Sequence, residues 1–453
     1  MKRILWTITV ALLMAGMVTG CNEDSETAVT PKEQIKPDSP QNSTENEEKP
    51  GSHETDSSVI NMLPKAQPMK LTGEQLKLVE NNNIFSTNLF AMINSLDKEK
   101  RSNFLSPISV TYLLSMLNDG AAGETSKEIM AMLGFAESDT KSINELCKAL
   151  IDGAPEVDPA VSVDISSYIA ANSHLGVQLE DLFRKDMETY YRAEAASLDF
   201  SSPDALKTIN GWCNQKTDGK IEKILDKLDA NALLVLMNAI NFKATWVSKF
   251  DEKNTKAETF TKDDGKTVEL PLMHQEALVR FASNDTYSTL LLPYGGTNAE
   301  WYMYLLLPQE NKTVKDVLEK IEGLNWTNFF WETDIYKVDI KIPRFKTTSE
   351  NDLIASITKL GAPSIFDPNK ADLSKMCSNS KNLYVSKMLQ KATIDVNEKG
   401  TEAVAVTAAV VDPTDAPLKP KPTAEFHANH PFVYVIQERS SGAIFFIGTF
   451  RGE

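Results

Sequence analysis

Apolar residues recur three and four positions apart in two stretches near the start of what we predict to be the folded part of the chain, from about residue 71. The first stretch follows Thr72 and extends to Ile93, a spacing that gives a helix one apolar face. The second runs from Pro107 to Gly120. Proline in the first turn and glycine at the end favour helix initiation and termination. The pattern therefore predicts two helices with these bounds.

Shorter runs rich in β-branched and aromatic residues follow later in the chain, and they predict strands. Helices early and strands late indicate an α+β fold, because regular alternation of the two would instead indicate a parallel α/β sheet. No second linker and no internal repeat interrupts this region, so we predict one large domain over 71–453. The predicted strands lie at 233–242, 288–292, 301–307, 338–342, 393–396 and 432–436.

Residues 1–20 predict a targeting segment rather than a part of the fold. Lys2 and Arg3 precede an apolar run over 4–18, which is too short to span a membrane as a helix. The run ends in Val-Thr-Gly-Cys at 18–21. This sequence resembles the cleavage box of bacterial lipoproteins, in which the cysteine thiol receives a diacylglycerol. We therefore expect a lipoprotein signal peptide over 1–20 and a lipid on Cys21; the alternative is an ordinary secretory signal with a chance cysteine.

The composition changes after Cys21. Residues 22–58 contain no aromatic and almost no large apolar residue, and they are rich in Glu, Asp, Ser, Thr, Pro and Asn. Such a segment cannot bury enough apolar surface to offset the entropy lost on ordering. We predict a disordered, acidic, lipid-anchored tether over 21–70. The anchor implies attachment to a bacterial outer membrane, on its periplasmic or its cell-surface face, and the acidic residues Glu23, Asp24 and Glu26 resemble surface-export signals of some Gram-negative bacteria.

Charge and cysteine content narrow the classes of function. The formal net charge is −16 and the pI is about 5.0, whereas phosphate binding needs clustered Lys and Arg, so we expect no nucleic-acid partner. With Cys21 lipidated, Cys147, Cys213 and Cys377 remain, an odd number without the close spacing of a zinc site or a disulfide framework. We expect these three to be small buried apolar residues.

Motifs of hydrolases, zinc proteases and phosphate-binding loops do not occur: there is no G-x-S-x-G, H-E-x-x-H or G-x-x-x-x-G-K-[ST]. His427 and His430 are three apart, but the apolar residues after Pro431 predict entry into a strand rather than a metal site. Asp263 and Asp264 precede a glycine and predict a hairpin tip rather than an acid–base pair. We therefore expect no enzyme activity, no metal and no cofactor.

Four separated stretches resemble the serpin family of serine protease inhibitors, in the family's order and at its spacing. One match could arise by chance, but four in order across nearly the whole domain make the resemblance specific. The stretches are 103–109 (Asn-Phe-Leu-Ser-Pro-Ile-Ser) with 118–125; 209–212, 217–221 and 238–246 (Asn-Ala-Ile-Asn-Phe-Lys-Ala-Thr-Trp); 342–346 (Ile-Pro-Arg-Phe-Lys) with 360–361 and 371–374; and 397–403 (Asn-Glu-Lys-Gly-Thr-Glu-Ala) with 430–432 and 446–448.

The resemblance implies a serpin fold of about nine helices and three β-sheets with an exposed reactive-centre loop. The implied function is inhibition of serine or cysteine endopeptidases. The protease cuts the loop, is held as an acyl-enzyme, and is trapped when the cleaved loop inserts into the main sheet. Serpin loop insertion is itself a standard example of strand addition and of released strain. The alternative is a non-inhibitory binding or carrier protein of the same fold, and in both cases we expect a monomer.

The segment after Glu398 corresponds to the family's loop hinge, and its composition permits insertion. Between Thr401 and Val411 the residues on one face are small or β-branched, none is charged after Glu402, and no proline occurs before Pro413. Such residues fit a central strand with every backbone donor available, which favours inhibition over the carrier function. The hinge residues implied by the resemblance are Glu398, Gly400, Thr401, Glu402, Ala403 and Ala405.

The resemblance also implies a polar cluster that gates the opening of the main sheet. Family members usually have histidine where this chain has Gln390. Glutamine can still donate and accept hydrogen bonds, so the network can persist with an altered opening energy. The cluster consists of Ser106, Ser109, Asn238, Trp246 and Gln390.

The family's spacing from Glu398 places the reactive bond between Thr414 and Asp415, in a loop that is longer than in typical members. Lys419 and Lys421 each precede a proline, and trypsin-like enzymes cut such bonds poorly because the tertiary amide does not sit correctly in their site. The valines and threonine nearby suit small apolar pockets, so we predict an elastase-like serine endopeptidase as the target. Residues 416–424 are rich in proline, and we expect them to extend the loop outward in a polyproline-like form.

Overall fold

The computed structural model describes residues 65–379, 382–401 and 421–453. The chain divides into two units, Met1–Asp56 and Ser57–Glu453, and all described residues belong to the second. The signal peptide, Cys21 and most of the predicted tether therefore lie outside the described residues. The α-helices of the described part are α1 (Gly73–Leu96), α2 (Pro107–Gly120), α3 (Gly123–Leu133), α4 (Thr140–Gly153), α5 (Asp181–Tyr191), α6 (Pro203–Lys216), α7 (Val314–Ile321), α8 (Trp326–Phe329) and α9 (Ile354–Leu360).

The two helices predicted from the apolar spacing are confirmed as α1 and α2. Helix α1 begins at a capping box: the Thr72 hydroxyl accepts a hydrogen bond from the Gln75 amide (3.2 Å), and the Gln75 side chain accepts one from the Thr72 amide (2.9 Å). These bonds satisfy two backbone donors that the first turn would leave unpaired. Helix α2 has Pro107 in its first turn and ends at Gly120, as the sequence predicts.

The folded domain begins earlier than the predicted boundary at residue 71. Residues 65–70 fall within the predicted tether because the apolar periodicity begins at about residue 71, but they already make backbone contacts with the domain. The amide of Ala66 donates to the carbonyl of Thr297 (3.2 Å) and that of Gln67 to the carbonyl of Val157 (2.7 Å). Ala66 is buried. Paired backbone groups hold this segment together with the side chains of Ala66 and Met69, and so few apolar residues give no periodic signal in the sequence.

The larger sheet has nine strands and is antiparallel except at one edge, where β13 pairs parallel with β9. The resemblance implies three sheets. Hydrogen bonding joins two of them here, because β6 pairs with β5 and β9 along most of its length and with β7 at its end. The order is β1 (Asn103–Leu105), β15 (Ile444–Phe450), β14 (Phe432–Glu438), β8 (Trp301–Pro308), β7 (Tyr287–Tyr294), β6 (Thr267–Ser283), β9 (Asp334–Pro343) and β13 (Thr423–His427), with β5 (Lys256–Thr261) paired to β6.

The smaller sheet has six strands and contains the candidate site. All six strands that the sequence predicted are confirmed: four in the larger sheet and two, β4 and β11, in this one. The predicted hairpin tip at Asp263 and Asp264 is also confirmed, between β5 and β6. The strand order is β10 (Phe345–Asp352), β11 (Val385–Asn397), β12 (Gly400–Thr401), β4 (Leu234–Thr245), β2 (Val161–Asn172) and β3 (Glu194–Leu198).

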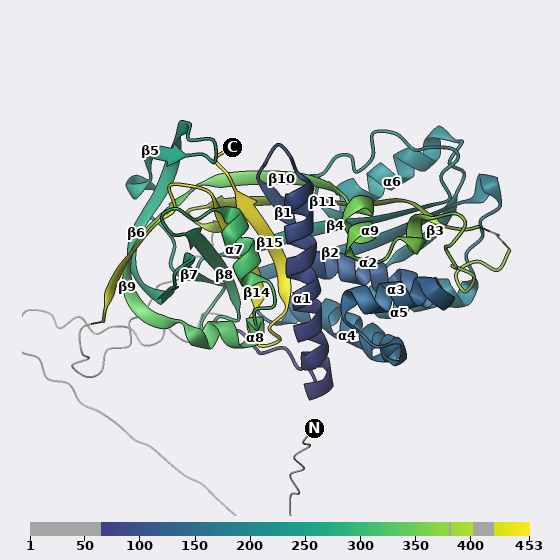
Figure 1. Cartoon of the computed structure of the whole chain (residues 1–453), viewed down its shortest axis with the longest axis horizontal. Coiled ribbons are helices and arrows are strands. Elements are labelled where there is room, and N and C mark those ends of the chain that lie inside the picture. The colour runs from purple at the N-terminus through teal and green to yellow at the C-terminus, as the bar shows by residue number, and fades with distance from the viewer. Residues whose placement is uncertain (1–64, 380–381, 402–420) are drawn as a thin grey trace, which may run out of the picture. The chain divides into compact units, whose positions relative to one another are not determined.

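The two faces of the smaller sheet pack against different partners because side chains alternate along β2 and β4. Ile169 of β2 and Leu236 of β4 face the main core. Tyr168 and Met237, one position away on each strand, belong to a second cluster with Trp212 of α6. Helix α6 therefore covers one face and α2 the other, as Figure 1 shows.

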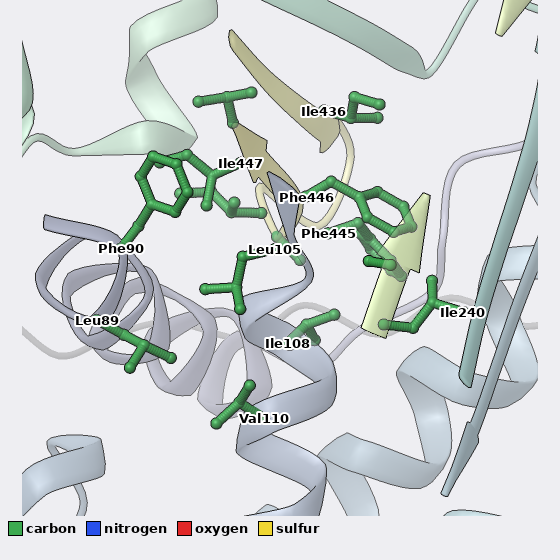
Figure 2. Close-up of a cluster of buried hydrophobic side chains, with 14 of the residues drawn as sticks. Leu89, Phe90, Leu105, Ile108, Val110, Ile240, Ile436, Phe445, Phe446 and Ile447 are labelled. Carbon is green, nitrogen blue, oxygen red and sulfur yellow. The ribbon is translucent and has the colours of Figure 1, made fainter. Parts of the chain in front are cut away.

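The main core joins both sheets. Its side chains come from α1, β1, α2, β4, β14 and β15, and Figure 2 shows part of this cluster. Phe242 of β4 packs against Phe446 of β15 with ring centroids 5.3 Å apart, which ties the smaller sheet to the larger one. Burial of apolar area on this scale is the dominant stabilising term for such a domain. The labelled core residues are Leu89, Phe90, Leu105, Ile108, Val110, Ile240, Ile436, Phe445, Phe446 and Ile447.

Candidate functional site

A two-residue strand, β12, lies between β11 and β4 at one end of the smaller sheet. Gly400 lies opposite Asn397 of β11 on one side and opposite Thr245 of β4 on the other, antiparallel to both. Further along the sheet β11 and β4 pair directly and in parallel, as far as Lys391 opposite Ala239. The sheet is therefore opened at one end by the width of a strand, and the predicted loop hinge occupies the opening.

Between β12 and the directly paired part of the sheet, a stretch of β4 and a stretch of β11 have no cross-strand partner among the described residues. Residues 240–243 of β4 and 392–395 of β11 form no register pair with each other or with β12 in the described part of the chain. On their outer sides they remain paired, to β2 and β10 respectively. The opening is therefore longer, measured along the strands, than the two residues of β12.

Glycine is required at position 400 by the close approach of β4. Gly400 has a φ of 145°, which other residues rarely adopt. A Cβ atom there would lie 2.1 Å from the carbonyl oxygen of Ala244 and 2.7 Å from the Cα of Thr245. The turn before it is fixed by a hydrogen bond from the Lys399 amide to the Asn397 side chain (3.0 Å).

Glu398, the first predicted hinge residue, is held by two other segments. Its Oε1 accepts hydrogen bonds from Arg344 (2.6 Å) and from the hydroxyl of Thr255 (2.6 Å), and its side chain is buried. Its carbonyl accepts a bond from the amide of Phe250 (3.0 Å). Burial alone would raise the pKa of Glu398, but the bonds from Thr255, its own backbone and Arg344 outweigh it and hold the pKa below its usual value.

Trp246 forms the other side of the hinge. Its amide donates to the carbonyl of Lys399 (2.9 Å) and its indole Nε1 to the carbonyl of Asn397 (2.9 Å). The indole stacks on Tyr294, with centroids 4.2 Å apart and planes at 12°. The Tyr294 hydroxyl is 2.6 Å from the hydroxyl of Thr401, so the first loop residues are held on both sides of the turn.

The predicted sheet-opening cluster is brought together only in part. Gln390 accepts a hydrogen bond from the Ser106 amide (2.7 Å) and donates to the Ser106 carbonyl (2.9 Å) and to the Ser109 hydroxyl (2.9 Å). Asn238 is the cross-strand neighbour of Gln390, but its side chain donates to Ser167 of β2 (2.8 Å). The network ties the start of α2 to β11.

Trp246 does not belong to this cluster, which corrects the prediction. Asn238 and Trp246 are eight residues apart on or next to β4, a separation of about 26 Å along a strand. Asn238 is opposite Gln390, whereas Trp246 follows Thr245 at the hinge. The sequence indicates that Asn238, Trp246 and Gln390 lie on or next to strands, but it does not show which of them are opposite one another.

Other predicted site residues fall outside the described residues: Cys21, Glu402, Ala403, Ala405, Thr414 and Asp415. Of the proline-rich segment 416–424, the structure describes only the last four residues. There Thr423 and Ala424 already pair with Lys337 and Val338 of β9, so this part of the expected polyproline extension is instead a strand. Parallel pairing to β9 supplies the backbone hydrogen bonds that a polyproline helix lacks.

The two histidines three residues apart have different roles. His427 ends β13 and its Nε2 lies 2.9 Å from Asp339 of β9, while His274 of β6 lies 2.6 Å from the other oxygen of the same carboxylate. His430 precedes β14, which begins at Phe432. Among the described residues, no group of three or more His, Cys, Asp or Glu side chains is placed to hold a metal ion.

The three cysteines expected to be buried are buried. Cys147, Cys213 and Cys377 have free thiols in the interior, and burial raises the pKa of Cys213 to about 12. None of the helices in the described ranges is both long and apolar enough to cross a membrane.

Sequence reasoning missed the residues that hold the hinge. Arg344 and Thr255 lie 54 and 143 positions from Glu398, and Tyr294 lies 107 positions from Thr401. Arg344 is part of the stretch 342–346, but nothing in one sequence indicates its partner.

Comparison with known proteins agrees with this geometry. The sequence model of the family described as "Serpin (serine protease inhibitor)" matches residues 80–452. The leukocyte elastase inhibitor of Equus caballus is 33% identical over 387 residues, covering 82% of this chain and 97% of that protein. The chain therefore belongs to the serpin family, whose members are generally protease inhibitors and not enzymes, although some are non-inhibitory.

Two solved structures have the same fold. The native state of tengpin, a thermophilic serpin, superposes with a TM-score of 0.75 at 27% identity, covering 87% of this chain and 98% of that one. Human thyroxine-binding globulin in complex with its hormone superposes with a TM-score of 0.73 at 27% identity, covering 83% of this chain and 98% of that one. The predicted serpin fold is confirmed.

Proposed function

We propose that this chain inhibits elastase-like serine endopeptidases by inserting its cleaved loop into the smaller sheet, and that a lipid on Cys21 holds it on a bacterial outer membrane. The observation that carries the inhibitory part is the position of β12. Gly400 and Thr401 already lie as a strand between β11 and β4. Residues 402–411 follow directly. Continuing the strand would place 402–405 beside 240–243 and 392–395, and 406–411 would enter where β4 and β11 pair with each other, so these two strands would have to separate there.

Insertion is favourable because it adds a central strand. Residues 240–243 and 392–395 have no partner across the opening among the described residues, and insertion would give them a hydrogen-bonded neighbour there. The hydroxyl of Thr401 contacts the buried Tyr294, so its side chain faces the core. Because side chains alternate along a strand, the residues two, four, six, eight and ten positions later would face the same way. These are Ala403, Ala405, Thr407, Ala409 and Val411, all small or β-branched.

The target class is inferred from the residues around the proposed bond. Thr414 and the valines before it suit a small apolar pocket, whereas both nearby lysines precede proline. The likeness to a relative named leukocyte elastase inhibitor supports the same class.

The test is incubation of the purified chain with an elastase-type and, separately, a trypsin-type serine protease. We expect an SDS-stable complex with the first, and a released loop fragment that starts at Asp415. Cleaved chain without any stable complex contradicts inhibition. Cleavage only after Lys419 or Lys421 contradicts the elastase-like target. Likeness to thyroxine-binding globulin favours a carrier as the second candidate function, and that candidate predicts cleavage without trapping.

The membrane part of the proposal is tested separately. Cys21 follows Val-Thr-Gly, and the acidic segment 22–58 would act as a tether between the lipid and the domain. In a bacterial host, the unchanged chain should fractionate with the outer membrane, and a Cys21→Ala variant should not. Release of both forms as water-soluble protein contradicts the anchor.

A further inference from the structure

Three of the six large apolar side chains exposed on the described surface gather around one arginine. They are Leu278 of β6 (52% exposed), Trp331 (66%) and Ile335 of β9 (36%). Trp331 lies in a short 3-10 turn, Phe330–Glu332, just before β9. We call these three residues, with Arg280, the Arg280 patch. Large apolar side chains that gather on one part of a surface, unlike single scattered ones, indicate a binding site.

The patch is held rigidly from beneath. Arg280 lies opposite Ile335 in the pairing of β6 with β9. Its guanidinium is 4.1 Å from the ring centre of Phe330 and 5.6 Å from that of Trp331, and it donates hydrogen bonds to the carbonyls of Phe330 (3.4 Å) and Thr333 (2.5 Å). The ring of Trp331 also packs edge-on against Phe330, with centroids 5.0 Å apart. An exposed tryptophan fixed in this way can bind a partner with little loss of side-chain entropy.

The patch lies where the chain returns from the reactive loop. Thr423, the first residue of β13, pairs with Lys337 of β9, and the Lys337 amide donates to the carbonyl of Pro422 (2.9 Å). Lys337 in turn pairs with Leu278 of the patch on its other side. Residues 415–422 separate the proposed bond from Thr423, a reach of about 25–30 Å at full extension. A protease–inhibitor interface of about 800 Å² per partner is about 30 Å across, which is comparable to this longest reach.

We propose that the Arg280 patch is a docking surface for the target protease, a second contact beside the reactive loop. This inference rests on the proposed function. Tryptophan and arginine are the residues that most often dominate binding energy at such contacts. The patch carries charges of both signs: Arg280 lies within it, exposed Lys337 is opposite Leu278, and Glu332 and Asp334 are exposed at its border. The protease surface that fits therefore has an apolar centre and a polar rim.

The experiment measures the second-order rate constant for reaction of the full chain with an elastase-type protease. The double variant Trp331→Ala with Leu278→Ser should lower this constant about tenfold or more, with an unchanged unfolding temperature. Trp331→Phe should retain most of the rate. The matched control is Leu182→Ser, which removes an even more exposed leucine (79%) at the start of α5 and should leave the rate within about twofold.

The docking proposal is wrong if the rate constant of the double variant stays within about twofold of that of the unchanged chain. It is also wrong if the Leu182→Ser control lowers the rate constant as much as the double variant does. The constant can be measured whether the protease is trapped or only cleaves the loop. A chain that is cleaved without trapping therefore contradicts the proposed function, while the effect of the variants still decides the patch. A chain that reacts with no elastase-type protease contradicts both.

Discussion

Replacement of Gly400 by alanine tests whether the opening between β11 and β4 is the insertion site. The added Cβ would lie 2.1 Å from the Ala244 carbonyl oxygen and 2.7 Å from the Cα of Thr245, so the strands must separate or the hinge must leave. Forcing extra atoms into a packed position costs about 1–3 kcal/mol, and a positive φ at a non-glycine residue costs about another 1–3 kcal/mol. The two residues of β12 gain about 1 kcal/mol per backbone hydrogen bond, about 2–4 kcal/mol in all. Because the cost is comparable to the gain, we expect the hinge to leave the sheet.

The same clash would remain in the inserted state, because Gly400 would keep its place at the head of the new strand. A cost of about 2 kcal/mol in the transition state slows insertion about 30-fold. The protease would then complete hydrolysis before it is trapped. We expect Gly400→Ala to be cleaved as a substrate, with many more inhibitor molecules consumed per protease bound. The assay is a titration of protease activity read together with the ratio of complex to cleaved chain on a denaturing gel.

A matched control separates backbone strain from the clash. Gly265, in the turn between β5 and β6, also has a positive φ (78°), but a Cβ there would meet no atom within 4 Å. Gly265→Ala should cost about 1 kcal/mol of unfolding free energy and leave the ratio of complex to cleaved chain unchanged. The reasoning is refuted if Gly400→Ala traps protease as efficiently as this control.

Three further substitutions test hydrogen-bonded side chains of the hinge and the interior, the latter including Asp119 of α2. Glu398→Gln removes the charge from two hydrogen bonds and should cost about 2 kcal/mol of unfolding free energy, with a change in the fluorescence of Trp246; an unchanged urea midpoint contradicts this. Burial raises the pKa of Asp119 to about 6, so the folded state binds its proton more tightly than the unfolded state, and stability is lost as pH rises from about 4 through 6. Asp119→Asn should therefore flatten the pH dependence of unfolding between pH 4 and 7 and add about 2 kcal/mol at pH 7.5, whereas an unchanged slope would exclude this residue as its cause. Gln390→Met removes all three bonds to Ser106 and Ser109 and should lower the unfolding free energy by about 3 kcal/mol in urea titration; a loss below 1 kcal/mol would mean that water replaces them.

Local signals in the sequence predicted the elements well. The spacing of apolar residues placed α1 and α2, and runs of β-branched and aromatic residues placed β4, β7, β8, β9, β11 and β14. These signals are local because one face of a helix or strand must be apolar to be buried. The motif around 397–403 likewise drew attention to the segment whose residues Gly400 and Thr401 lie between β11 and β4.

Non-local features could not be predicted in the same way. The grouping of Trp246 with Gln390 failed because the register between β4 and β11 depends on pairing across more than 150 residues of sequence. The start of the domain was placed too late because backbone hydrogen bonds, which leave no compositional signal, hold Ala66 and Gln67. The partners of Glu398 were missed because they, too, are far from it in the sequence.

Hydrogen exchange of the smaller sheet before and after loop cleavage tests the account most directly. In the uncleaved chain, residues 240–243 and 392–395 have no partner across the opening within the described residues. If the cleaved loop inserts there, the backbone amides of these two segments that face the opening should exchange much more slowly, and the unfolding temperature should rise. Unchanged exchange in both segments of the cleaved chain would contradict insertion as the mechanism of this protein.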